Sequence, residues 1–432
     1  MKLVNILSLP LLLLPLLYGC AYLESAEGTR ESRTGGDAAS AFSPPGQFTS
    51  GSPLLYSDLS PSGQPGAAPV LTISADETLT LFFETEGIES AQYTLRFSHH
   101  NPDWSSSSLP PEFYLDGLPE VYLSRGELNR NSPFRYRQYS YTFPNRDIRF
   151  RLSGNYMLRI SNSQTGNLLF TLPFFVSENE GSLRASVERI LKAGTERRIQ
   201  HRPVARYVSP EFVEMPQFDL SVFYAQNQFW GRMKEALETD FSGTAESGFE
   251  LRQGDGFNGN FAAASVDIRT LSQLEPDIDN ISPAEVPVEL LIDEDIDNLY
   301  SDSGVDFTNI LPGALRTTDS EYTDAEFRFD PGTEIKAGES VYLTGDFNNW
   351  QIEEKLKLSD ASAPGFQSVT VRIKQGHYRY KYILYDGERF DLNPFESAFA
   401  NQRQEYHAFV YFRDPETQSY RLLNVLRVRG PG

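Results

Sequence analysis

Short runs in which apolar and polar residues alternate, separated by Gly, Pro and Asn, constrain the fold of this chain most strongly. In the first half, alternate positions are apolar in the segments 79–83, 93–97, 156–160 and 168–172. Such alternation is typical of strands with one buried face, and frequent turn residues between them indicate antiparallel neighbours. We therefore predict an all-β protein built from tandem immunoglobulin-like β-sandwich domains, the first over residues 51–178.

Composition divides the rest of the chain into three parts. Residues 179–272 are assigned to a middle β domain, because 218–224 alternates like a strand, although 183–191 has helical spacing. Between Arg269 and Arg316 there are 11 acidic residues and no Lys or Arg, which predicts an extended acidic connection over 273–320. Strand patterns return in 341–345, 369–373 and 378–384, so residues 321–432 are predicted to form a C-terminal sandwich.

The amino terminus has the features of an export signal. Lys2 precedes an apolar run that is too short to span a membrane comfortably and contains two prolines. The run ends in Leu17-Tyr18-Gly19-Cys20, which resembles a bacterial lipobox. We predict cleavage between Gly19 and Cys20, removal of residues 1–19 and acylation of Cys20, with an ordinary signal peptide as the alternative. Residues 20–50, rich in Ser, Gly, Pro and Ala, are predicted to form a flexible tether.

Charge and cysteine content exclude several classes of function. The net charge of −21 makes binding to nucleic acid improbable, because its phosphates would be repelled. Cys20 is the only cysteine, so the chain cannot build a disulfide framework or a cysteine-based metal site. No G-x-S-x-G, Walker or H-E-x-x-H sequence occurs, and the histidines follow no ligand spacing. We predict no catalytic residue, no cofactor and no metal.

Two ligand-like patterns are better explained as loops. Residues 254–259 match G-x-G-x-x-G, but they lack the strand before and the helix after that a dinucleotide site requires. Asp293, Asp295 and Asp297 have the spacing of a calcium loop, yet the sixth and twelfth positions are Asn298 and Gly304. We interpret the first as a surface turn and do not assign a calcium site to the second.

Aromatic residues near the carboxyl end allow one binding hypothesis. Trp350, Tyr378 and Tyr380, with Asn401, could form a platform on which a sugar stacks. The simpler interpretation, which we favour, is that these rings fill the core of a sandwich. Glycan binding is kept as an alternative function that depends on these four residues being exposed.

Two sets of motifs resemble known families. The segments 345–350 and 374–382 resemble the early-set sandwich of glycogen-binding modules. A longer collinear series resembles the plug protein family of the type IX secretion system of Bacteroidetes. That series occupies positions 99–104, 112–117, 143–145, 153–156, 226–230, 266–271, 345–350, 374–382 and 410–413.

The second resemblance implies a protein that is not an enzyme and that blocks the periplasmic mouth of a large outer-membrane β-barrel translocon. With the lipobox, it implies a periplasmic protein held to outer-membrane lipid through Cys20. A glycan-binding outer-membrane lipoprotein is the alternative. A glycoside-processing enzyme is disfavoured, because nothing upstream of the C-terminal sandwich looks like a catalytic domain.

Overall fold

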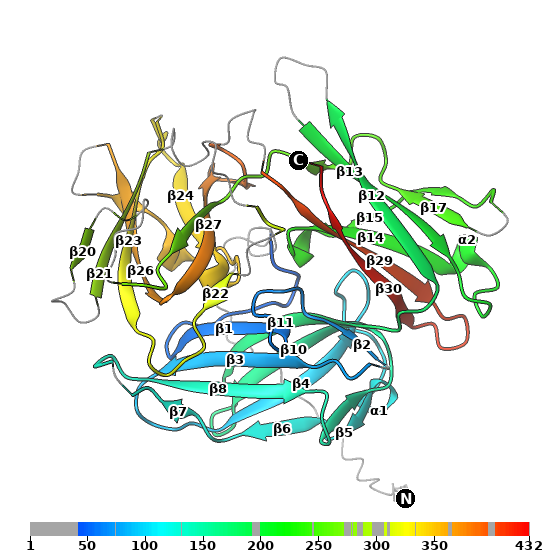
Figure 1. Ribbon diagram of the computed structural model, residues 1–432, viewed down its shortest axis with the longest axis horizontal. Coiled ribbons are helices and arrows are strands. Elements are labelled where there is room, and N and C mark those ends of the chain that lie inside the picture. Colours follow the sequence, from blue (N-terminus) through cyan, green and yellow to red (C-terminus); the bar gives the residue numbers. More distant parts are fainter. Residues whose placement is uncertain are drawn as a thin grey trace, which may run out of the picture. The chain divides into compact units, whose positions relative to one another are not determined.

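The computed structural model describes residues 42–431, except 74, 131, 192–198, 244–245, 272–277, 279, 283–287, 296–305, 309–311, 333, 362–364 and 396–401. The predicted signal peptide, the cleavage and lipidation site at Gly19 and Cys20, and most of the tether lie outside these residues, as do Asp297 and Asn401. The described part is nearly all β, as predicted (Figure 1). Among the described residues, no helix is long and apolar enough to cross a membrane.

The first sandwich is formed by two sheets from consecutive chain (Figure 1). One sheet has the order β1 (Leu54–Pro61), β3 (Leu79–Glu86), β8 (Tyr136–Phe143) and β7 (Glu127–Leu128). The other has the order β2 (Val70–Thr72), β11 (Leu168–Ser177), β10 (Gly154–Asn162), β4 (Tyr93–His100) and β6 (Glu120–Leu123). Helix α1 (Pro111–Tyr114) and the pair β5 (Leu115–Gly117) and β9 (Ile148–Phe150) close one end.

The second sandwich combines strands from two distant parts of the chain. Its first sheet runs β12 (Ser182–Leu191), β13 (Ile199–Val208), β17 (Ser247–Glu250) and β16 (Glu238–Asp240), with β18 (Phe257–Asn258) also paired to β13. Its second sheet runs β15 (Lys234–Glu235), β14 (Leu220–Gln226), β29 (Glu405–Arg413) and β30 (Tyr420–Arg429). Helix α2 (Pro216–Asp219) and the 3-10 helix η1 (Trp230–Arg232) flank β14.

The third sandwich is centred on one long strand, β27 (Gly376–Tyr385). It pairs with β19 (Ala264–Asp267), β22 (Gly313–Ala314), β24 (Ser340–Gly345) and β28 (Phe390–Asp391). The facing sheet has the order β20 (Asn280–Ser282), β21 (Val288–Asp295), β23 (Tyr322–Asp330), β26 (Gln367–Lys374) and β25 (Ser359–Asp360). The 3-10 helices η2 (Asp346–Asn348) and η3 (Glu354–Leu356) follow β24.

Strand exchange between the second and third sandwiches departs from the predicted domain ranges. Strand β19, inside the predicted middle domain 179–272, pairs with β27 of the third sandwich. Strands β29 and β30, inside the predicted C-terminal sandwich 321–432, complete the second one, where Leu220 to Gln226 face Phe412 to Tyr406 (Figure 1). Alternation identifies a strand but not its partner, and these partners are far apart in sequence.

Two local expectations also differ from the structure. The range 273–320, expected to be an extended connection, contributes β20, β21 and β22. Strand β21 pairs in parallel with β23, and Ile292 is fully buried in the core of the third sandwich. Positions 288, 290 and 292 are apolar, so an alternating pattern is present beneath the acidic composition.

The segment 183–191, with its helical spacing, is the strand β12, because its partly buried Leu183, Ala185 and Val187 alternate along one face.

Candidate functional site

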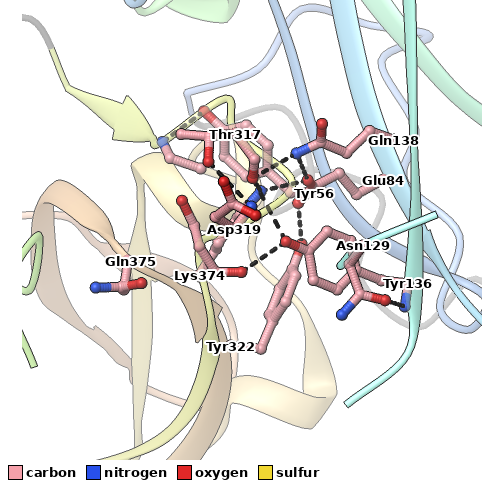
Figure 2. A network of polar contacts seen from close by, with 12 residues as sticks. Tyr56, Glu84, Asn129, Tyr136, Gln138, Thr317, Asp319, Tyr322, Lys374 and Gln375 are labelled. Carbon is pink, nitrogen blue, oxygen red and sulfur yellow. Dashed lines mark hydrogen bonds and ion pairs between the residues drawn. The ribbon is translucent and has the colours of Figure 1, made fainter. Parts of the chain in front are cut away.

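We take the contacts between the three sandwiches as the candidate functional site, because buried polar and aromatic side chains gather there. A network of buried polar groups lies where β3 and β8 of the first sandwich meet β23 and β26 of the third (Figure 2). Glu84 and Gln138 are directly opposite each other on β3 and β8. Tyr322 and Lys374 are likewise opposite each other on β23 and β26. Each sandwich thus presents one cross-strand pair to the other.

A fully buried ion pair is at the centre of this network. The side chains of Glu84 and Lys374 have no exposed surface, and Lys374 Nζ lies 2.5 Å from Glu84 Oε1. Gln138 Nε2 donates to the same oxygen at 2.8 Å, and the Tyr322 hydroxyl donates to Glu84 Oε2 at 2.5 Å. The Thr317 carbonyl accepts from both Lys374 Nζ, at 3.0 Å, and Gln138 Nε2, at 2.8 Å (Figure 2). We call Glu84, Gln138, Thr317, Tyr322 and Lys374 the interface network.

Burial shifts the titration of these groups toward their neutral forms. Desolvation raises the pKa of Glu84, with Lys374 opposing the shift, and desolvation lowers the pKa of Lys374, with Glu84 opposing it. Burial and the nearby Glu84 also raise the pKa of Tyr322 well above its ordinary value. The Tyr136 ring centroid is 4.8 Å from Lys374 Nζ and the Phe82 centroid 5.8 Å away. Removing either charge alone would leave its partner unpaired, at a cost of about 3–5 kcal/mol.

A second ion pair extends the same interface. Arg316, on the segment before β23, forms a hydrogen-bonded ion pair with Asp58 of β1, and it also donates to Ser60 Oγ at 2.6 Å. Its guanidinium carbon lies 5.3 Å from the centroid of the Phe82 ring. Desolvation raises the pKa of Asp58, and Arg316 opposes that shift. The first and third sandwiches are therefore joined by one fully buried ion pair and one partly buried ion pair.

The segment 345–350, which carried the resemblance to glycogen-binding modules, serves the same junction. Asp346 binds Arg379 through both carboxylate oxygens at 2.9 Å, and it accepts a hydrogen bond from Trp350 Nε1 at 2.8 Å. Asn349, with a positive φ of 55°, directs its amide to Ser57 of β1, with distances of 3.2 Å to the carbonyl and 3.1 Å to the hydroxyl. The motif thus holds the third sandwich against the first.

Three of the four residues of the alternative sugar platform are buried in hydrophobic cores, Trp350 in one and Tyr378 and Tyr380 in another. Trp350 is 8% exposed, and Tyr378 and Tyr380 are fully buried. The ring of Trp350 packs 5.0 Å from Phe229 and 5.6 Å from Phe42, measured between centroids. Rings enclosed in this way offer no face to a sugar. The structure therefore agrees with the core interpretation of these residues, and it does not bring them together at a surface.

The first and second sandwiches meet through an aromatic contact. Trp104 Nε1 donates to the Trp230 carbonyl at 3.1 Å, and the Tyr411 hydroxyl donates to Asn155 Oδ1 at 2.6 Å. Phe175 of β11 lies between Trp230 and Phe409, at 5.0 and 4.7 Å between centroids. Beside them, Arg421 forms two hydrogen bonds with Glu178, at 2.8 and 2.6 Å.

The motifs that carried the second resemblance therefore lie largely at contacts between sandwiches. Trp104, Asn155, Trp230 and Tyr411 come from four of those motifs, and all four join the first sandwich to the second. The Glu84–Lys374 pair between the first and third sandwiches was not singled out from the sequence. A glutamate directly after two phenylalanines in a strand, at 82–84, and a lysine that ends an alternating run, at 374, are the sequence features that could have indicated buried charges.

The placement of the histidines and acids in the described part of the chain bears on metal binding. Within the described residues, no group of three or more His, Cys, Asp or Glu side chains is placed to hold a metal ion. His99 is buried between Tyr114 and Tyr156 and bonds the Ser153 carbonyl at 3.1 Å. Desolvation lowers its pKa to about 4, so it is neutral near pH 7. The segment 254–259, predicted to be a turn, contains turn residues and the short strand β18.

Comparison with known proteins supports both resemblances. Residues 57–178 match the family model of the type 9 secretion system plug protein 1st domain, and residues 334–414 match that of the glycogen recognition site of AMP-activated protein kinase. No curated protein matches the chain. The first match coincides with the first sandwich. The second crosses from the third sandwich into β29 of the second.

Among solved structures, a hypothetical protein from Parabacteroides merdae is similar over 89% of this chain and 99% of its own, with a TM-score of 0.77 and 20% identity. At that identity the likeness establishes the fold. The C-terminal domain of the Streptococcus pyogenes antigen I/II-family protein AspA has 6% identity over 87% of this chain and 99% of its own, and its TM-score of 0.16 carries no argument. The fold of this chain therefore also occurs in the Parabacteroides merdae protein.

Proposed function

We propose that this chain, whose first sandwich matches the plug protein 1st domain of type 9 secretion, is a plug or gating component of such a system. It would seal the periplasmic side of a large outer-membrane β-barrel translocon when no cargo is loaded. The match over residues 57–178 is the observation that carries the proposal. The proposed role is mechanical, and no catalytic step is part of it.

The way the sandwiches are joined supports a mechanical role. A body that closes a pore must keep its shape against forces from either side. Here β19 is built into the third sandwich, and the chain then returns to the second through β29 and β30. Two ion pairs, one of them fully buried, fix the first sandwich to the third, and packed aromatic rings fix it to the second. Bending the body would expose charges and rings that are now buried, which is costly.

Lipidation of Cys20 would keep such a plug close to its channel. Acyl chains on Cys20 would hold the protein in the inner leaflet of the outer membrane, where the translocon also resides. The predicted tether runs from residue 20 to 50, but Phe42 is buried and Thr49 pairs with Phe170, so its end belongs to the folded body. The part before Phe42, residues 20–41, would span roughly 25 Å as a random coil. A tether of that reach would raise the effective concentration of the plug at the pore and allow it to dock again after release.

Leakage through the translocon tests this proposal. Cells lacking the gene should admit a large antibiotic or dye that intact outer membranes exclude, and the wild-type gene should restore the barrier. A strain that lacks both the plug and the translocon supplies the control, because its barrier should be intact if the leak passes through the translocon. A barrier that stays intact when the plug alone is removed would refute a sealing role.

A further inference from the structure

The interface network brings together the parts of a self-forming amide cross-link. Lys374 supplies an amine, Gln138 a side-chain amide, and Glu84 a carboxyl group hydrogen-bonded to both at 2.5 and 2.8 Å. The amine and the amide nitrogen share a second acceptor, the Thr317 carbonyl, at 3.0 and 2.8 Å. Two nitrogens that share two acceptors are confined to the same small volume, and here they come from different sandwiches (Figure 2).

We infer that Lys374 and Gln138 are a site of covalent modification, in which an isopeptide bond joins the third sandwich to the first. Glu84 would be the proton carrier between the two reacting groups. The placement is set by strand pairing, because Glu84 and Gln138 are directly opposite on β3 and β8 and Lys374 is the last residue of β26. The side chains of Glu84 and Lys374 have no exposed surface and Gln138 is 9% exposed, so the reacting groups are largely shielded from bulk water.

The surroundings favour the neutral amine that the reaction needs. The faces of the Tyr136 and Phe82 rings, 4.8 and 5.8 Å from Lys374 Nζ, attract a cation, so the neutral amine is favoured by the loss of surrounding water and not by the rings. In this setting burial lowers the pKa of Lys374 and raises that of Glu84, which favours passage of a proton from the ammonium to the carboxylate along their hydrogen bond. The Thr317 carbonyl accepts from Nζ and helps to hold it beside the amide.

The step balances without an outside reagent. A proton moves from Lys374 Nζ to Glu84 Oε1, and the free electron pair of Nζ attacks Cδ of Gln138. Glu84 then gives a proton to Nε2 and takes one from Nζ, the Cδ–Nε2 bond breaks, and ammonia leaves. The Nζ–Cδ bond remains as an amide, and Glu84 ends protonated with Tyr322 still bonded to its other oxygen. Nothing is oxidised or reduced.

Peptide mass analysis of the full chain tests the inference directly. Trypsin should release residues 138–146 and 373–379 as one joined species, lighter than the two separate peptides by about 17 Da, the mass of one ammonia. Fragmentation should place the bond between Gln138 and Lys374. Trypsin cuts after a free Lys374 but not after a cross-linked one, so finding residues 138–146 and 375–379 as separate, unmodified peptides of the folded wild-type protein would overturn the inference. Condensation of Lys374 with Glu84 would instead join residues 34–96 to 373–379 with a loss of about 18 Da, the mass of one water, and would also overturn the inference.

Two variants separate the roles of the residues. Glu84→Gln keeps the shape of the side chain but removes the proton carrier, so the joined species should disappear. Gln375→Asn changes a neighbouring amide that bonds the Glu321 N–H and the Arg269 carbonyl instead, so the joined species should persist. A joined species that persists in a folded Glu84→Gln variant would refute the role of Glu84. If that variant does not fold, the wild-type peptides still decide the question. The cross-link is a property of the chain alone and does not depend on the proposed docking.

Discussion

Replacing Phe42 with alanine tests whether the first described residues of the chain hold the sandwiches together. The Phe42 ring is 2% exposed and lies 4.7 Å from Phe229, 5.6 Å from Trp350 and 6.1 Å from Phe261, measured between centroids. Phe229 precedes the 3-10 helix beside the second sandwich, and Trp350 follows β24 of the third. Truncation of a buried phenylalanine costs about 3–5 kcal/mol of unfolding free energy.

Urea unfolding followed by tryptophan fluorescence and circular dichroism measures this cost. The Phe42→Ala variant should unfold at lower urea concentration, with a loss of about 3–5 kcal/mol. Phe48→Ala is the matched control, because Phe48 is on the same segment but 38% exposed, and it should cost less than about 1 kcal/mol. In a double-mutant cycle, Phe42→Ala and Trp350→Ala should be coupled by about 0.5–1.5 kcal/mol. A loss below about 1 kcal/mol for Phe42→Ala, with no coupling, would refute the reasoning.

Three further predictions concern the fold, its pH dependence and its anchor. A chain that ends at Gln404 lacks β29 and β30 of the second sandwich and should not give a soluble folded protein. If circular dichroism and limited proteolysis showed three intact sandwiches in that chain, the strand exchange would be contradicted. Burial lowers the pKa of His99 and His201 to about 4, so between that value and 6.5 the unfolded chain binds protons that the folded one does not. Stability to urea should therefore fall by about 2 kcal/mol per histidine from about pH 7 to about pH 5, and an unchanged midpoint would contradict this. Cys20→Ser should move the protein from the membrane to the soluble fraction of the periplasm and Tyr18→Ala should not; equal fractionation of both variants would argue against lipidation.

The fold class was predictable from the sequence because strand alternation is a local property. Positions 156–160 and 168–172, for example, lie on β10 and β11 of the first sandwich, as expected. Strand partners were not predictable, because β14 pairs with β29 across nearly half the chain and nothing local encodes that contact. Acidic composition also concealed β21, whose apolar positions 288, 290 and 292 alternate beneath a net negative charge.

The candidate site was predictable only in part. The aromatic residues at 350, 378 and 380 could be assigned to a core, because large rings in alternating strands are usually buried. The buried ion pair of Glu84 and Lys374 could not be predicted, because a charged residue in a strand normally lies on the solvent face. Recognising a buried ion pair requires both partners, and these two are 290 positions apart and belong to different sandwiches.

Recovery of the protein from native outer membranes most directly tests the proposed docking on a translocon. The full lipidated chain, tagged at its carboxyl end, would be crosslinked in cells, purified under denaturing conditions and analysed by mass spectrometry. A tagged outer-membrane lipoprotein of another function would be the control for proximity alone. A large outer-membrane β-barrel should be enriched with this chain and not with the control. Equal recovery of that barrel with both, or its absence from both, would contradict the proposed function.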